Sequence, residues 1–273
     1  MASDEPTMET MGQIEADATA SPSPEKVAKL SVEELRASAS DPSLTEDAAL
    51  RLLQRNDLPA EVLERIGKNK AIARSRKAKL ALVEHPRTPR HISVPVLRSL
   101  FTFDLMRVAL APVVPADVKI AAEETLIHRL ETISSGEKLT LARRASGRIS
   151  GELLLDTEAR VVSAALENSR LTEAAVIRGL MRGDASAKLV ELVCHHARWS
   201  VRREVRIALL RNGNTPLGRA LEFARSLPAA LLPEILDTSR LPADIKAHLL
   251  RDLRAAKQGP DSKTRRKPVK PTA

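Results

Sequence analysis

Apolar residues recur along this chain at the spacing of one helical face, in short runs separated by polar or proline-containing turns. The pattern is clearest over residues 157–223, where Val201, Val205, Ala208 and Leu209 form one of several such stripes. Residues three, four and seven positions apart share one side of an α-helix, so each stripe predicts a helix with one buried face. Helices this short cannot bury that face alone. The pattern therefore predicts neighbouring helices that stack on one another.

A short sequence motif marks where these helices begin. Its first copy is Leu58-Pro59-Ala60-Glu61-Val62, and related motifs follow at residues 114–118 and 241–245. Proline at the first helical position leaves no N–H unpaired, and an acid two residues later lies at the positive end of the helix dipole. Ser or Thr in place of Pro can cap the helix with a side-chain oxygen. The predicted helix starts are Pro59, Pro89, Pro115, Ser150, Thr172, Ser200, Pro216 and Pro242.

These starts predict irregular repeats of about 22–35 residues, with one shorter gap of 16 between Ser200 and Pro216, and such a period is typical of helical repeat arrays. Composition supports helices: aliphatic residues dominate, and the chain has no Tyr, one Trp and three Phe. Aromatic and β-branched residues are the usual strand formers, and the chain is poor in the aromatic ones. The sequence therefore predicts an all-α fold, an α-solenoid of short stacked helices.

Charge and composition divide the chain into three parts. Residues 1–25 hold six acids and no Lys or Arg, for a net charge of −6, while residues 257–273 carry +5. Neither end has enough apolar surface to offset the entropy of ordering. We expect a disordered acidic tail over residues 1–28, a helical-repeat domain over residues 29–256 and a disordered basic tail over residues 257–273.

Several local features carry their own expectations. Three prolines predict extended or turn structure over residues 84–96, and Ser134-Ser135-Gly136 predicts a loop. Phe101 and Phe103 are expected to fill the core. Trp199, at a repeat junction, could be an exposed anchor for a partner, but filling the gap between two helical layers is the favoured interpretation.

The body of the chain is basic, since residues 26–256 carry +10. Its densest basic run, over residues 68–79, contains no acid, and Arg lies two positions before five of the predicted helix starts. Basic surfaces favour anionic partners, although a run of this kind is more often a solvated convex face. The arginines would form a ladder if the repeats stack in register. The candidate anion- or partner-binding residues are Lys68, Lys70, Arg74, Arg76, Lys77, Lys79, Arg87, Arg148, Arg170, Arg198 and Arg240.

Little in the sequence points to catalysis. Cys194, His195 and His196 are the one cluster of metal-ligand types, but consecutive helical residues point about 100° apart, so packed core residues are favoured over a metal site. Neither a glycine-rich phosphate loop nor a G-x-S-x-G motif is present. We expect no catalytic, cofactor-binding or metal-binding residues, no cofactor, and a protein that is not an enzyme.

Nothing in the sequence predicts secretion or a membrane. No apolar run approaches the roughly 18 residues that span a bilayer. The N-terminus is acidic, without the basic and then apolar regions of a secretory signal. A lone Cys194 permits no internal disulfide. We expect a cytoplasmic protein that does not bind membranes.

Residues 161–172 and 205–216 resemble repeats of bacterial α-solenoids, because in each a short apolar helix leads through an Asn-containing turn to a Leu-Thr or Thr-Pro pair. The resemblance is closest to leucine-rich-repeat-variant and HEAT-like proteins and covers about residues 48–253. It implies alternating short helices wound into a superhelix. The chain departs from the cluster-bearing variant member, since it lacks the cysteines for an iron–sulfur cluster.

Three functions are compatible with these features. The favoured one is a non-enzymatic scaffold that binds a protein or peptide partner on an extended surface. The alternative is sequence-nonspecific binding of duplex DNA or structured RNA by the basic face, whereas the scarcity of aromatic residues counts against single-strand binding. HEAT-like proteins also include DNA glycosylases, but no acid and aromatic pocket can be assembled from this sequence. The sequence leaves the oligomeric state open.

Overall fold

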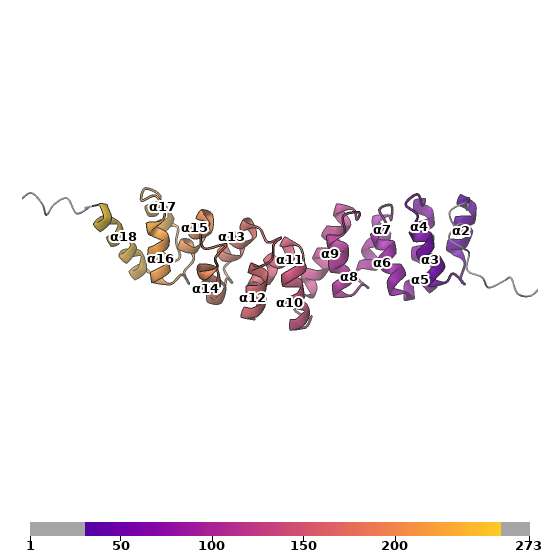
Figure 1. The fold of residues 1–273 in the computed structure, drawn as a ribbon, viewed down its shortest axis with the longest axis horizontal. Helices are drawn as coiled ribbons and strands as arrows, with labels where there is room; N and C mark the ends of the chain where they lie inside the picture. The colour runs from indigo at the N-terminus through magenta and orange to yellow at the C-terminus, as the bar shows by residue number, and fades with distance from the viewer. Residues whose placement is uncertain (1–30, 258–273) are drawn as a thin grey trace, which may run out of the picture. The chain divides into compact units, whose positions relative to one another are not determined.

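The structure is a computed structural model that describes residues 31–257, with side chains to residue 254. This range is all-α and contains no strand (Figure 1), which confirms the predicted all-α class. The predicted tails lie outside the described residues, apart from Lys257 at the end of α18. Over the described range, none of the helices has the length and apolar character that crossing a bilayer requires.

Seventeen α-helices and one 3-10 turn are found in the described residues. In chain order they are α2 (Val32–Ser40), α3 (Glu46–Leu53), α4 (Ala60–Lys68), α5 (Lys70–Arg74), α6 (Arg76–Glu84), α7 (Arg90–Leu97), α8 (Thr102–Leu110), α9 (Ala116–Arg129), α10 (Ser135–Arg144), α11 (Gly147–Glu152), η1 (Leu153–Leu155), α12 (Ala159–Leu166), α13 (Glu173–Met181), α14 (Ala187–His195), α15 (Arg203–Arg211), α16 (Leu217–Arg225), α17 (Leu232–Asp237) and α18 (Ala243–Lys257).

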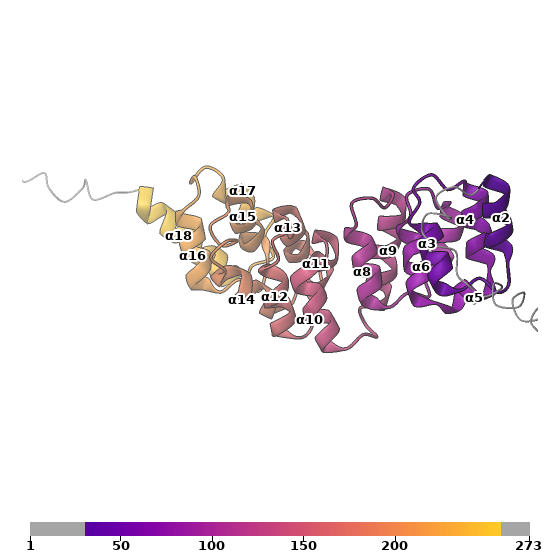
Figure 2. The same cartoon turned by 45° about the vertical axis from the view of Figure 1, so that its right-hand side comes forward.

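The chain divides into two units, residues 1–126 and 127–273. Within the first unit, α2 packs on α4, α4 on α6, and α6 on α8. Within the second, α10 packs on α12 and α12 on α14, while α11 packs on α13, α13 on α15 and α15 on α17 (Figure 2). Helices two positions apart in the chain are therefore neighbours inside each unit, as expected where pairs of helices repeat.

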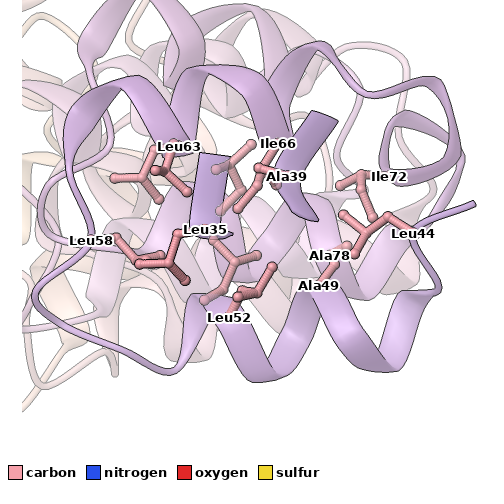
Figure 3. Packing of buried hydrophobic residues seen from close by; sticks show 13 residues of the cluster. Leu35, Ala39, Leu44, Ala49, Leu52, Leu58, Leu63, Ile66, Ile72 and Ala78 are labelled. Carbon is pink, nitrogen blue, oxygen red and sulfur yellow. The ribbon is translucent and has the colours of Figure 1, made fainter. Parts of the chain in front are cut away.

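The core of the first unit is aliphatic. Figure 3 shows side chains from α2, α3, α4, α5 and α6 directed into a shared interior. Leu35, Leu63 and Ile66 are each at most 2% exposed. Burying such a side chain contributes about 1.5–3 kcal/mol, so these short helices depend on one another for their stability.

Six of the eight predicted helix starts are confirmed. The helices begin immediately after Pro59, Pro89, Pro115, Thr172, Pro216 and Pro242. The proline was expected at the first helical position, but Pro59 is the N-cap, with an extended ψ of 147°. Its carbonyl oxygen accepts hydrogen bonds from the N–H groups of Val62 and Leu63, and its missing N–H costs nothing there.

The other two predicted starts are wrong. Ser150 lies inside α11, which begins at Gly147, and its hydroxyl donates to the carbonyl oxygen of Ala142. Ser200 lies in a turn that runs on to Arg202, so α15 begins only at Arg203. Val201, which was expected on the buried stripe of this helix, precedes it and is 61% exposed. Ser bonds to backbone groups in several local arrangements, and its presence alone does not fix a helix end.

Two predicted irregular segments are also partly helical. The turn-rich segment predicted over residues 84–96 contains most of α7, with Pro95 inside the helix. The loop predicted at residues 134–136 is a helix start, because Ser134 and Glu137 form a capping box at the beginning of α10. Serine followed three residues later by glutamate is a strong start signal, and it outweighed the Ser/Gly composition.

The expected core role of Phe101 and Phe103 is wrong, since they are 63% and 43% exposed. Thr102 and Leu105 are buried at this end of α8 instead. Phe103 lies about 200° around α8 from Leu105 and so on the opposite side, while Phe101 is the N-cap, whose extended backbone with a ψ of 163° precedes the helix. Trp199 is 1% exposed, which confirms its predicted role as a core residue.

Successive turns in each unit are joined by hydrogen bonds that span about one repeat. His85 Nε2 lies 2.8 Å from the carbonyl oxygen of Arg55 in the first unit. In the second, Asn168 Nδ2 donates to the carbonyl oxygen of Ala142 at 2.8 Å, while its Oδ1 accepts from the N–H of Arg170. One side chain thus holds its own turn and fastens it to the preceding repeat. The side chains that bridge repeats in this way are Asn69, His85, Asn168, Asn212 and Ser239.

Candidate functional site

The basic run at residues 68–79 covers the end of α4, all of α5 and the start of α6. Lys68 and Lys77 lie 3.8 and 3.5 Å from carboxylate oxygens, so their charges are partly balanced. Lys70 and Arg74, on α5, are exposed and have no hydrogen-bond or ion-pair partner among the described residues. The run therefore leaves two unpaired cations on one short helix.

Arg76 forms the strongest ion pair of this region. Its Nε and Nη2 donate to the two carboxylate oxygens of Asp104, each at 2.8 Å, and this side chain of α8 is only 7% exposed. The hydrogen bond with Asp104 raises the pKa of Arg76 above its usual value. The guanidinium also lies over the Phe101 ring, 5.0 Å from its centroid. A largely exposed aromatic ring is thus held against a fixed cation.

An apolar depression of about 280 Å³ is formed by α4, α5, α6, α7 and the turn after α7. It is lined by Gly67, Ile72, Ala73, Leu82, Pro95 and Val96, together with Lys79 and Ser99. Lys79 Nζ donates to Ser99 Oγ at 3.3 Å, and Ser99 precedes Phe101 by two residues. The Ser99 edge of the depression is therefore two residues along the chain from the exposed ring. We group the depression with Lys70, Arg74, Arg76, Lys79 and Phe101 under the name α5–α8 surface.

Pro95 links this depression to a second one of about 520 Å³, which Arg90, His91 and Val94 also line. Because Pro95 has no N–H, the carbonyl oxygen of His91 lacks its usual donor four residues on. His91 lines the second depression but not the first. The arrangement can accept an apolar side chain and a nearby anionic group from one ligand.

The arginines predicted to form a ladder bond to backbone groups inside the units. Arg87 Nη1 donates to the carbonyl oxygen of Asp57, and Arg170 Nη1 to that of Arg144. Arg198 donates to the carbonyl oxygens of Asn168 and Leu171 and lies over the Trp199 ring. These donors fasten turns together. Arg148 and Arg240 are exposed, and a ladder of all five residues stays a prediction because it spans both units.

Cys194, His195 and His196 make the contacts of structural residues. Cys194 is buried, and burial raises the pKa of its thiol to about 11. His195 Nδ1 bonds to the Glu191 carbonyl oxygen, and His196 Nδ1 accepts from the N–H of Arg198. No group of three or more His, Cys, Asp or Glu residues within the described range is arranged to hold a metal ion.

Sequence reasoning found the cations of the α5–α8 surface but missed Phe101 and the depression. A local signal was present, since aromatic residues at positions i and i+2 of a helix cannot both be buried on one face. The depression has no such signal, because four helices contribute to it.

Comparison of the chain with protein-family models, with curated proteins and with solved structures gave no match.

Proposed function

We propose that this protein is a non-enzymatic helical-repeat scaffold of the α-solenoid type, which binds a protein or peptide partner in the cytoplasm through the α5–α8 surface. The observation that carries the proposal is Phe101, which is 63% exposed, lies against Arg76 and follows Ser99 at the edge of the apolar depression by two residues. Aromatic and arginine side chains dominate the energetics of protein interfaces, and a pre-positioned ring loses little entropy on binding.

The open form of the depression favours a peptide side chain over a small molecule. Small-molecule sites enclose most of their ligand's surface, whereas this depression of about 280 Å³ and the second one that Pro95 shares with it are both open to solvent. One or two aliphatic side chains of a peptide would fill it. Lys79 at its edge and Lys70 and Arg74 on α5 favour acids next to those side chains.

A random peptide library displayed on phage and selected on the full-length protein tests the proposal. We expect enriched peptides that combine an apolar residue with neighbouring acids. Phe101→Ser and Lys79→Glu should each weaken their binding by about tenfold or more, as loss of an interface anchor does.

Val201→Ser is the matched control, because Val201 is an equally exposed apolar residue, at 61%, in the second unit. This variant should bind the selected peptides as the parent protein does. Selection of no peptide family, or undiminished binding by Phe101→Ser, would contradict the proposal.

A second candidate function is binding of duplex DNA or structured RNA, favoured by the unpaired Lys70 and Arg74. Phosphate contacts release counterions, so affinity should fall steeply between about 50 and 300 mM salt. Lys70→Glu combined with Arg74→Glu should then lower the slope of log K against log salt by about 2. Binding that vanishes near physiological salt in both proteins would leave only the scaffold proposal.

A further inference from the structure

We propose that, in the absence of a partner, the chain's own acidic segment at residues 4–17 occupies the α5–α8 surface. This inference rests on the proposed function, since it assigns a ligand to the same surface. It also specifies the ligand chemistry: a short acidic segment with apolar side chains at three-residue intervals.

Charge is the first argument. The segment contains no Lys or Arg, and its acids are Asp4, Glu5, Glu9, Glu15 and Asp17. On the surface, Lys70 and Arg74 have no partner in the described part of the chain, and Lys79 bonds only to the neutral hydroxyl of Ser99. Opposite charges attract over about 8 Å at physiological salt, so the segment and the surface are complementary.

Apolar matching is the second argument. Met8, Met11 and Ile14 are spaced three residues apart between the acids. Residues at this spacing share one side of a helical or polyproline-like backbone, so they can face one surface together. Methionine is unbranched and polarizable and adapts to irregular apolar gaps, which suits a shallow depression of about 280 Å³.

The connecting chain is long enough. Thirteen residues, 18–30, separate the segment from the first described residue, and they can extend to about 40 Å. Asn69 Nδ2 donates to the carbonyl oxygen of Ala39, so the end of α4 lies beside the end of α2. The start of α2 is therefore about 13 Å along the helix axis, the length of nine residues, and about 8–10 Å across from the Gly67 side of the depression.

Because the segment belongs to the same chain as the surface, a contact of low affinity is enough to keep it bound. A segment joined to the surface by a short connection has an effective concentration on the order of millimolar, so a segment with only millimolar intrinsic affinity is bound for much of the time. An acidic partner then has to displace the segment. The segment would thereby set a threshold of affinity that excludes weak anionic competitors.

Carbodiimide cross-linking of the full-length protein, which joins carboxylates to lysines without a spacer, tests the inference by mass spectrometry. We expect links from Glu9, Glu15 or Asp17 to Lys70 or Lys79, with yields unchanged by hundredfold dilution. Lys188, an exposed lysine of the second unit, is the reference and should give none. Equal yields at Lys188, or yields that fall with dilution and so report a second copy, would overturn the inference.

A variant with Met8→Ser, Met11→Ser and Ile14→Ser keeps every acid of the segment. Its cross-links should fall about fivefold, and its affinity for the phage-selected peptides should rise about three- to tenfold because the competitor is weakened. If the cross-links and the affinity for the selected peptides are both unchanged, the contact is only nonspecific charge attraction and the proposed docking is refuted. If peptides bind the parent protein but these links are absent, this inference fails while the proposed function stands.

Discussion

Gly147, the first residue of α11, lies directly against the carbonyl oxygen of Arg170, so that an added Cβ would fall less than 3.0 Å from that oxygen. The turn that contains Arg170 is held in place by Asn168, which bonds back to α10 and to Ser150 of α11. The close approach of two backbone segments therefore requires glycine here. The reason is space and not backbone conformation.

We expect Gly147→Ala to destabilise the protein by about 1–3 kcal/mol, because a methyl group forced against a fixed carbonyl shifts the backbone. The higher helix propensity of alanine, about 1 kcal/mol, opposes this only in part. Urea unfolding followed by circular dichroism measures the difference. Gly183→Ala is the control, since no atom lies within 4 Å of its added Cβ. Equal effects at both positions would show that packing at Arg170 is not responsible.

We expect replacement of Asn168 by aspartate to destabilise the protein, although the two side chains have nearly the same size. Its amide donates to the carbonyl oxygens of Ala142 and Ala145 and is 2% exposed. Asn168→Asp replaces these donors with a carboxylate facing carbonyl oxygens, and we expect a loss of about 2–4 kcal/mol at neutral pH. Asn56→Asp, at an exposed turn position, should change stability by less than about 0.5 kcal/mol. A neutral result at Asn168 would mean that the turn-to-turn bonds contribute nothing.

Phe101 and Phe223 allow the effect of removing an exposed ring on stability to be compared with that of removing a buried one. We expect Phe101→Ser to change the free energy of unfolding by no more than about 0.5 kcal/mol, because the ring is largely exposed. Phe223→Ser should cost about 3–5 kcal/mol, because that ring is 1% exposed. Chemical denaturation of both variants measures this. A large loss of stability in Phe101→Ser would indicate that the ring packs in the core. The proposed interface would then have no exposed aromatic anchor.

Cys194 should be unreactive in the native protein at pH 8. Burial raises the pKa of its thiol to about 11, and the thiolate is the reactive species. Labelling with a thiol reagent should therefore be slow in buffer and complete in urea. Since the native state favours the neutral thiol, its contribution to stability is full below the ordinary pKa of 9.0 and is lost as pH rises through about 11. Rapid labelling of folded protein would contradict the buried position.

Local signals account for what the sequence predicted well. Proline and Thr172 determine helix starts through bonds within one turn, so Pro59 and Thr172 could be placed without knowledge of neighbours. Ser150 could not, because its hydroxyl bonds to a carbonyl eight residues back instead of capping a helix. The cations of the α5–α8 surface could be predicted because they lie in one run of the sequence. The depression could not, because it depends on how four helices pack.

The hydrogen bonds between successive turns affect how the chain reaches this fold. Bonds such as His85 to Arg55 and Ser239 to Leu210 close loops of about 30 residues. Loop-closure entropy grows with loop length, and chains with mainly short-range contacts fold quickly. Each newly formed pair of helices can therefore bond to the pair before it as soon as it leaves the ribosome. Folding within each unit could then keep pace with synthesis and leave little apolar surface waiting for distant partners.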